Sequence, residues 1–173
     1  MTLAAALAAR PILWILALVA AQRLSELWLA EANTRQLKAH GAREVGARHY
    51  PLFILLHGSW LAALLLTTRW TTQPHWGLIG VFALMQFGRF WVVMTLGPFW
   101  TTRIITLDGA PLVRRGPYRW VRHPNYWVVS IEIAALPLAF GDWPVAVVWT
   151  VLNAALLRYR IKIEEQALAA RRA

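Results

Sequence analysis

Long apolar blocks separated by short basic stretches constrain this chain more than any other feature. Five blocks stand out, at about Ile12–Ala30, Pro51–Thr67, Trp76–Leu96, Tyr126–Phe140 and Pro144–Leu157. Apolar runs of about 17–25 residues match the length of a membrane-crossing helix. Hydrophobic residues make up 58% of the chain, against about 45–50% in soluble domains. We therefore expect one domain over residues 1–173, an all-α polytopic transmembrane bundle of about five helices.

The last two blocks are short for membrane crossings. Fifteen residues of helix rise only about 22 Å, whereas the hydrocarbon core is about 30 Å thick. Either flanking residues such as Arg158 reach the interface, or the two segments form a tight helical hairpin. The sequence Gly141-Asp142-Trp143-Pro144 suits the turn, because Gly ends helices, Asp caps them and Pro fits a first turn.

The basic residues predict the topology. They gather in the stretch after the first block, in the stretch after the third block and in the C-terminal tail. Five crossings put all three stretches on one side, which the positive-inside rule makes cytoplasmic. We expect an integral protein of the bacterial inner membrane with its N-terminus outside. An alternative is a signal peptide ending at Val19-Ala20-Ala21, although the apolar run continues past that point.

Charge and composition also limit the partners. The net charge of +10 lies between apolar blocks, so anionic lipid head groups are the expected partner rather than nucleic acid. The chain has no cysteine, which excludes thiolate sites and cysteine nucleophiles. The five histidines do not cluster at ligand spacing, so no metal site is expected.

Several polar residues interrupt the apolar blocks. They are Arg23, Glu26, His57, Gln86, Arg89 and Glu132. Ionisable groups inside membrane helices are costly, and they mark either function or internal pairing. One interpretation is a polar pocket between helices, in which Arg89 contacts the substrate. The other is a set of buried ion pairs, Arg23–Glu26 and Arg89–Glu132, that fix helix packing.

The densest polar cluster runs from Arg114 to Tyr126. It reads Arg-Arg-Gly-Pro-Tyr-Arg-Trp-Val-Arg-His-Pro-Asn-Tyr, and its Pro and Gly residues prevent one continuous helix. Arg side chains bind carboxylates or phosphates, and aromatic rings bind flat rings or cations. The segment is either a cytoplasmic cofactor-binding loop or a basic loop that contacts lipid head groups. A second cluster, Arg158–Leu168, has helical spacing and by itself predicts a salt-bridged helix end.

Together the two clusters resemble a known family. The elements Gly116-Pro117-Tyr118-Arg119 and Arg122-His123-Pro124-Asn125-Tyr126, followed by Arg160 and Glu164-Glu165-x-x-Leu168, are similar to the isoprenylcysteine carboxyl methyltransferase family. The similarity extends to other small membrane methyltransferases, including phospholipid methyltransferases. It is strongest over about residues 96–168. The stretch from Asn33 to His57 also resembles a bacterial subgroup that often acts on polyketide-derived lipids such as alkylpyrones or alkylresorcinols.

The resemblance implies a fold and a chemistry. It implies an S-adenosylmethionine pocket, with S-adenosylhomocysteine as product, built from the loop before the fourth helix and a C-terminal helix. A lipophilic or prenylated acceptor would enter from the bilayer. Carried over by motif, the cofactor-binding residues are Arg115, Tyr118, His123, Pro124, Tyr126 and Glu165. Arg160 and Glu164 are the expected catalytic residues, and Arg89 and Trp127 the expected substrate-binding residues.

The residue chemistry agrees with methyl transfer to oxygen. Aromatic faces and a carboxylate such as Glu164 stabilise a sulfonium cation, and Arg160 suits an anionic acceptor oxygen. A carboxylate or acidic enol needs no base, whereas a phenol needs one, for which His123 or Glu164 is a candidate. Two alternatives stay open: an NADPH-dependent sterol-type membrane reductase and a non-enzymatic small membrane protein. No Gly-x-Gly occurs, so a Rossmann cofactor fold is not expected.

Overall fold

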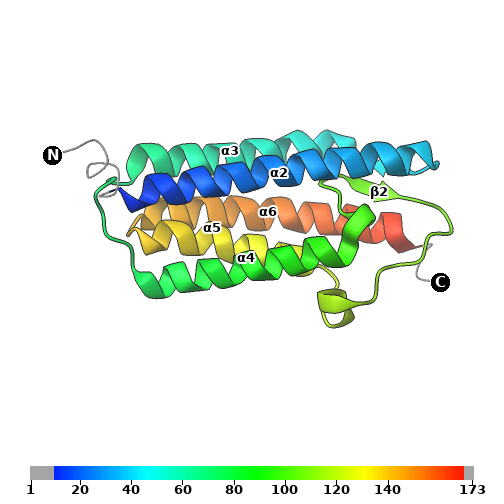
Figure 1. Ribbon diagram of the computed structural model, residues 1–173. Coiled ribbons are helices and arrows are strands. Elements are labelled where there is room, and N and C mark those ends of the chain that lie inside the picture. The colour runs from blue at the N-terminus through cyan, green and yellow to red at the C-terminus, as the bar shows by residue number, and fades with distance from the viewer. Residues whose placement is uncertain (1–9, 170–173) are drawn as a thin grey trace.

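Five long helices form one bundle in the computed structural model, which describes residues 10–169. The helices are α2 (Pro11–Ala39), α3 (Tyr50–Thr67), α4 (Trp76–Leu96), α5 (Pro124–Ala139) and α6 (Trp143–Leu168), and they run side by side (Figure 1). The prediction of an all-α helical bundle is confirmed. Pro11, Pro51, Pro124 and Pro144 each lie in the first turn of a helix, where a missing N–H costs nothing.

Within residues 10–169, three stretches are both long and apolar enough to cross a membrane: Pro11–Ala39, Ala47–Thr67 and Trp76–Phe99. The bundle also exposes many large apolar side chains and buries several polar ones beside its apolar core. Leu66, Phe87 and Trp28 are more than 70% exposed, while Glu132 and Asn153 are at most 1% exposed. Large apolar side chains on the outside of a bundle are unfavourable in water but favourable in contact with lipid. The chain is therefore an integral membrane protein.

Two helices are longer than their apolar blocks. Helix α2 continues past Ala30 to Ala39, and α6 continues past Leu157 to Leu168. The predicted C-terminal helix is thus not a separate element but the last part of α6. Its 26 residues rise about 39 Å, enough to reach from one end of the bundle to the other. Hydropathy alone missed this extension because the added turns are polar.

The predicted turn between α5 and α6 is confirmed. Gly141 has a positive φ of 73°, a conformation that favours glycine. The Asp142 side chain caps α6 by accepting from the Val145 N–H. It also accepts hydrogen bonds from the hydroxyls of Thr67 and Thr68 at the end of α3. One aspartate therefore ties three helix ends together at the end of the bundle opposite the loops.

A small two-stranded sheet, absent from the sequence predictions, joins two loops at the basic end. Strands β1 (Arg43–Val45) and β2 (Ile104–Thr106) pair antiparallel, with Arg43 opposite Thr106. Two ion pairs flank the sheet: Arg43–Asp108 at 2.6 Å and Arg103–Glu44 at 2.9 Å. Three-residue strands carry too weak a pattern to be predicted, since a strand signal needs about four to eight residues.

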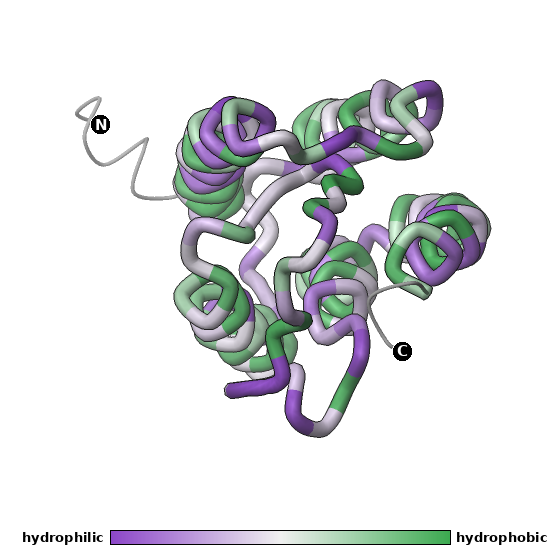
Figure 2. Tube along the Cα trace, turned by 90° about the vertical axis from the view of Figure 1, so that its right-hand side faces the viewer, coloured by the Kyte–Doolittle hydropathy of each residue, from purple (hydrophilic) through white to green (hydrophobic). Residues whose placement is uncertain are grey.

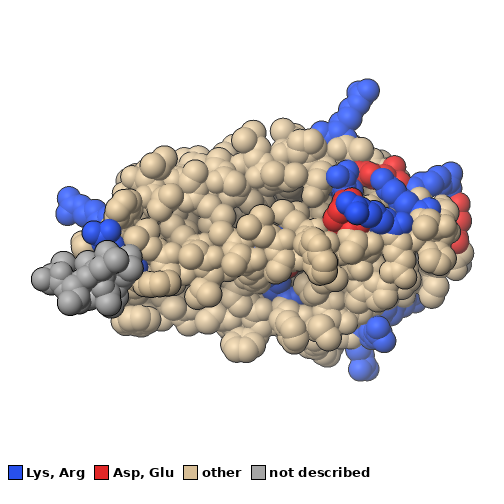
Figure 3. Space-filling model, turned by 45° about the horizontal axis from the view of Figure 1, so that its top comes forward, with Lys and Arg blue, Asp and Glu red and all other residues tan. Residues whose placement is uncertain are grey.

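Charge is distributed unevenly along the bundle. On the face shown in Figure 3, Lys and Arg gather mainly at the end that carries the β1–β2 sheet, and the middle is mostly uncharged. Figure 2 looks onto this end, where the loops cross between the helices. Which end faces the cytoplasm stays a prediction, because it rests on the charge rule alone.

Candidate functional site

A cavity of about 960 Å³ runs from the loop end of the bundle into the space between the helices. Its inner part is lined by apolar side chains of α2 and α3, including Leu24, Leu27, Ile54 and Leu61. Its outer part is lined by polar residues of the loop before α5 and of α6. One chamber therefore offers both an apolar environment and a polar one, as a site for a lipid and a polar cofactor requires.

The polar part centres on four residues, which we call the loop-end cluster: His123, Tyr126, Arg160 and Glu164. Arg160 Nε donates to the Tyr126 hydroxyl at 2.7 Å, and the Tyr126 hydroxyl donates to Glu164 Oε2. Tyr126 lies on α5, and Arg160 and Glu164 lie on α6. The turn at Asp142 holds these two helices side by side. The cluster thus links the two segments that sequence analysis predicted to form one site.

Arg160 is held on three sides. Its Nη2 donates to the Thr102 carbonyl at 2.9 Å, and its guanidinium lies 5.0 Å from the centroid of the Phe53 ring. Among the described residues Nη1 has no hydrogen-bond partner. Because Arg160 lines the cavity, this nitrogen is available to an anionic oxygen. Glu164 Oε1 is likewise unpaired within residues 10–169.

His123 stacks flat on Tyr126, with ring centroids 5.1 Å apart and planes 6° apart. Its Nδ1 lies 3.7 Å from Glu164 Oε2, and its Nε2 lies 3.8 Å from Glu165 Oε1. Both separations exceed a hydrogen bond, so Nε2 is buried without a hydrogen-bond partner in the described chain. Pro124, the first residue of α5, has no side-chain donor and acts through the backbone it fixes.

Tyr118 also lines the cavity. Burial raises the pKa of its hydroxyl, and the nearby Glu164 carboxylate raises it further, so the phenol stays protonated.

Arg115, two residues before Pro117, faces α4 instead of the cavity, and its Nη2 donates to the Thr95 carbonyl at 3.4 Å. The intervening Gly116 has a φ of 56°, and a Cβ there would lie 2.5 Å from Thr95 Oγ1. Glycine therefore lets the loop approach α4 closely.

Two other predicted site residues lie at the edge of the cavity or outside it. Glu165 is 39% exposed in its side chain and pairs with Arg122 at 3.6 Å. Trp127 is 67% exposed and does not line the cavity. It follows Tyr126 by one residue, which turns it about 100° away on the helix. We therefore leave Trp127 out of the site.

Sequence reasoning omitted several cavity residues. Arg114, Arg119, Arg122 and Asn125 line the cavity beside the predicted residues, and Asn125 Oδ1 is buried without a partner in the part of the chain that the structure describes. Phe53 lies in the stretch that resembles the bacterial subgroup but was not singled out there, and Thr102 lies in a segment that carried no motif. The Arg residues were visible in the loop's composition, but the contacts of Phe53 and Thr102 depend on tertiary packing.

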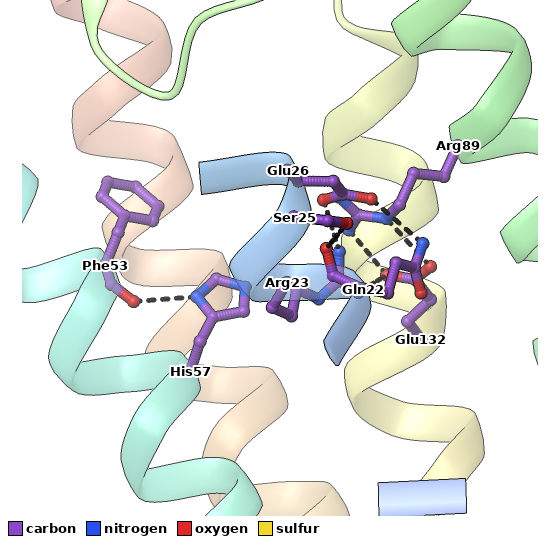
Figure 4. Close-up of polar contacts among 8 residues, drawn as sticks. All are labelled: Gln22, Arg23, Ser25, Glu26, Phe53, His57, Arg89 and Glu132. Atoms are coloured by element: carbon purple, nitrogen blue, oxygen red, sulfur yellow. Dashed lines mark hydrogen bonds and ion pairs between the residues drawn. The ribbon is translucent and has the colours of Figure 1, made fainter. Parts of the chain in front are cut away.

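Deeper in the bundle, four charged residues form what we call the charge network: Arg23 and Glu26 on α2, Arg89 on α4 and Glu132 on α5 (Figure 4). Arg23 pairs with Glu26 at 3.2 Å and with Glu132 at 2.7 Å. Arg89 pairs with Glu26 at 2.9 Å and with Glu132 at 2.7 Å. Both predicted ion pairs are present, and cross-pairing joins them into one network with no net charge.

The network also borders the cavity, which is lined by Arg23, Glu26 and Arg89. The two interpretations of these residues therefore overlap, since one set of side chains pairs internally and faces the chamber. All three guanidinium nitrogens of Arg89 donate hydrogen bonds to Glu26 or Glu132. Few N–H groups of Arg89 are therefore left for the predicted contact with substrate.

Comparison with known proteins supplies independent information. The sequence profile described as the isoprenylcysteine carboxyl methyltransferase (ICMT) family matches residues 78–170, or 93 of the 173 residues. The uncharacterized protein YpbQ of Bacillus subtilis is 36% identical over 90% of this chain and 95% of its own length. An uncharacterized protein of Haemophilus influenzae is 28% identical over 88% of this chain and 92% of its own length. No solved structure gives a significant match.

The matched region contains most of α4, the loop before α5, and all of α5 and α6, and it includes every residue of the loop-end cluster. The resemblance inferred from short motifs is thereby confirmed at the level of the family. The family is one of membrane methyltransferases that use S-adenosylmethionine. On the match and the cluster geometry together, this chain belongs to the isoprenylcysteine carboxyl methyltransferase family.

Proposed function

We propose that this protein transfers a methyl group from S-adenosylmethionine to an oxygen of a lipophilic acceptor held in the cavity. The observation that carries the proposal is the cavity itself. It joins the loop-end cluster to an apolar chamber between membrane helices. A polar cofactor and an apolar acceptor can meet there without leaving the membrane, and binding in the correct orientation supplies much of the catalysis.

The residues of the loop side fit the proposed cofactor. Arg119 and Arg122 line the cavity and suit the cofactor's carboxylate. His123 Nε2 and Asn125 Oδ1 are buried polar atoms without partners among residues 10–169, and buried polar groups normally have partners. The adenosine and amino acid groups of the cofactor offer donors and acceptors for both atoms. Glu164 and the ring of Tyr126 suit a positively charged sulfur.

The bound cofactor supplies a methyl group on a sulfonium and leaves as the neutral thioether. The role proposed for Arg160 is to hold the acceptor oxygen in line through its free Nη1, because Tyr126 and Thr102 fix its other nitrogens. Glu164 offers its free Oε1 to the cofactor's cation or to the proton of a neutral acceptor. A carboxylate acceptor carries no such proton, whereas a phenol does. The apolar chamber excludes water, which strengthens these electrostatic contacts.

The proposed topology places the loop end in the cytoplasm, where the cofactor is made, with the N-terminus outside. The clustering of Lys and Arg at that end supports this orientation. Membrane lipids surround the bundle, and the acceptor comes from the same bilayer. Leu, Ile and Phe side chains line the inner part of the cavity and suit an apolar tail.

The test is methyl transfer by the purified protein in lipid vesicles. Vesicles receive S-adenosylmethionine labelled on its methyl group together with a lipid extract from a bacterium that carries a relative. We expect label to enter an organic-soluble product, and Arg160→Ala to abolish it while the protein stays folded. Binding of NADPH in place of S-adenosylhomocysteine would favour the reductase. Binding of neither nucleoside would favour a non-enzymatic protein.

A further inference from the structure

The inner end of the cavity carries a polar group that the proposed methyl transfer does not use. His57 on α3 lines the cavity, and its Nδ1 lies 2.8 Å from the Phe53 carbonyl oxygen. A carbonyl only accepts, so Nδ1 carries the proton, and a neutral ring then presents Nε2 as an acceptor. Among residues 10–169 Nε2 has no partner. The ring points toward Arg23 (Figure 4).

Arg23 adds an unused donor at the same depth. Its terminal nitrogens are bound to Glu26 and Glu132, while its Nε–H is buried without a partner in the described chain. The charge network beneath has two arginines and two glutamates, so its net charge is zero. A site with one free acceptor, one free donor and no net charge suits a neutral hydroxyl better than an ion.

The position of His57 relates this site to the loop-end cluster. Phe53 and His57 are four residues apart on α3, which is about 6 Å along the helix axis. The guanidinium of Arg160 lies 5.0 Å from the centroid of the Phe53 ring, while the Phe53 carbonyl is the partner of His57 Nδ1. Phe53 therefore contacts both polar groups, Arg160 through its ring and His57 through its backbone. Two polar groups that line one cavity suit an acceptor that carries two polar substituents.

We propose that His57, with Arg23 beside it, forms a second acceptor subsite that selects lipids carrying a neutral hydroxyl in addition to the oxygen that is methylated. The inference rests on the proposed function and names the substrate class for the same cavity. The acidic oxygen of the acceptor lies at Arg160, the hydroxyl donates to His57 Nε2, and the alkyl tail follows Leu24 and Leu61. An acceptor without the hydroxyl leaves Nε2 unpaired.

The test compares two probe lipids that differ in one group: a long-chain meta-alkylbenzoate and its analogue with an additional meta-hydroxyl. Dissociation constants are measured by titration of the detergent-solubilised protein saturated with S-adenosylhomocysteine. We expect the hydroxylated probe to bind about tenfold more tightly, the effect of one hydrogen bond worth about 1.4 kcal/mol. His57→Leu should reduce the preference to about one without weakening S-adenosylhomocysteine.

Two further variants make the result decisive. His57→Phe keeps the ring volume without a polar edge and replaces His57→Leu if that protein does not fold. Gln86→Leu is the matched control, because both Gln86 side-chain polar atoms are also buried without a partner in the described residues but do not line the cavity. It should keep the preference.

The outcomes separate the two proposals. Equal dissociation constants for the two probes, or a preference that survives both His57 variants, would overturn the His57 subsite and leave the methyltransferase proposal standing. Absence of S-adenosylhomocysteine binding in a folded sample would overturn the methyltransferase proposal itself.

Discussion

The loop-end cluster and the charge network use similar residues in opposite ways. In the network every carboxylate faces two guanidinium groups, and Glu132 is 0% exposed. In the cluster the ionic groups are only partly paired: Arg160 keeps a free Nη1 and His123 an unpaired Nε2. Closed pairing neutralises charge inside the membrane, whereas open pairing leaves atoms for a ligand. Pairing therefore separates the charges that we expect to stabilise the fold from those that we propose bind the cofactor and acceptor.

Breaking the closed network should have the largest effect. Glu132→Gln removes one carboxylate and leaves two buried arginines facing Glu26. Removing one partner of a buried pair costs about 3–5 kcal/mol, so we expect little folded protein, measured as monodisperse yield and Tm in detergent. Glu31→Gln is the control, since Glu31 pairs with Arg35 at the surface. An unchanged Tm for Glu132→Gln would mean that the network does not hold the bundle.

Breaking the open cluster should affect activity instead of folding. Glu164→Gln removes the charge that faces the proposed transfer centre, and loss of such a group typically costs about 100-fold in rate. We expect kcat to fall by that factor at unchanged Tm, measured by methyl transfer in vesicles. Lys162→Gln, on the exposed side of α6, is the matched control. Wild-type turnover in Glu164→Gln would return this segment to a purely structural role.

A milder change in the same cluster should weaken the cofactor alone. His123→Ala removes the ring stacked on Tyr126 and the buried Nε2. We expect the Kd for S-adenosylhomocysteine to rise about tenfold, or about 1.4 kcal/mol, with little change in Tm. His40→Ala, at the exposed end of α2, controls for loss of an imidazole. Equal affinity in His123→Ala and wild type would remove His123 from the cofactor site.

The smallest expected effect on stability concerns Glu44. Like each glutamate of the charge network, Glu44 pairs with two cations, here Lys38 and Arg103, but it lies on β1 at the end of the bundle. Burial alone would raise the pKa of Glu44, but hydrogen bonds from Lys38 and Arg103 outweigh it and lower the pKa. Because the pKa of Glu44 is lower in the folded protein than in the unfolded chain, the Glu44 charge stabilises the fold at pH values above the unfolded pKa of about 4.3. This stabilisation is lost as the pH falls through the pKa of the folded state.

Glu44→Gln should therefore lower Tm by about 1–3 °C at pH 7. The difference from wild type should shrink below about pH 4, as measured by thermal unfolding across that range. A Tm difference that stays constant on acidification would show that the Glu44 charge contributes nothing to stability.

The sequence predicted the helices well and the cluster in part. The third apolar block has the same bounds as α4, because a membrane helix is marked in the sequence by a long run of apolar residues. The helix over Arg158–Leu168 was predicted, but its continuity with the fifth apolar block was not, because the block loses its apolar character after Leu157. The motif residues His123 and Tyr126 were found because they lie close together in sequence.

Residues brought in by packing alone could not be predicted. Phe53 contacts Arg160 across 107 positions of sequence, and Thr102 contributes only a backbone carbonyl, which no side-chain pattern reveals. Trp127 follows Tyr126 in sequence but does not line the cavity, so its contact with substrate stays a prediction. The cross-pairing of the charge network was likewise invisible, because spacing fixes partners only within one helix.

We propose that the loop-end cluster binds the methyl donor, whereas the charge network stabilises the bundle around it. Calorimetric titration of the detergent-solubilised protein with S-adenosylhomocysteine tests this directly, with NADPH as the comparison ligand. We predict saturable binding of S-adenosylhomocysteine alone, weakened by His123→Ala and unaffected by Glu31→Gln. Absence of binding in a folded sample, or saturable binding of NADPH instead, would contradict the account.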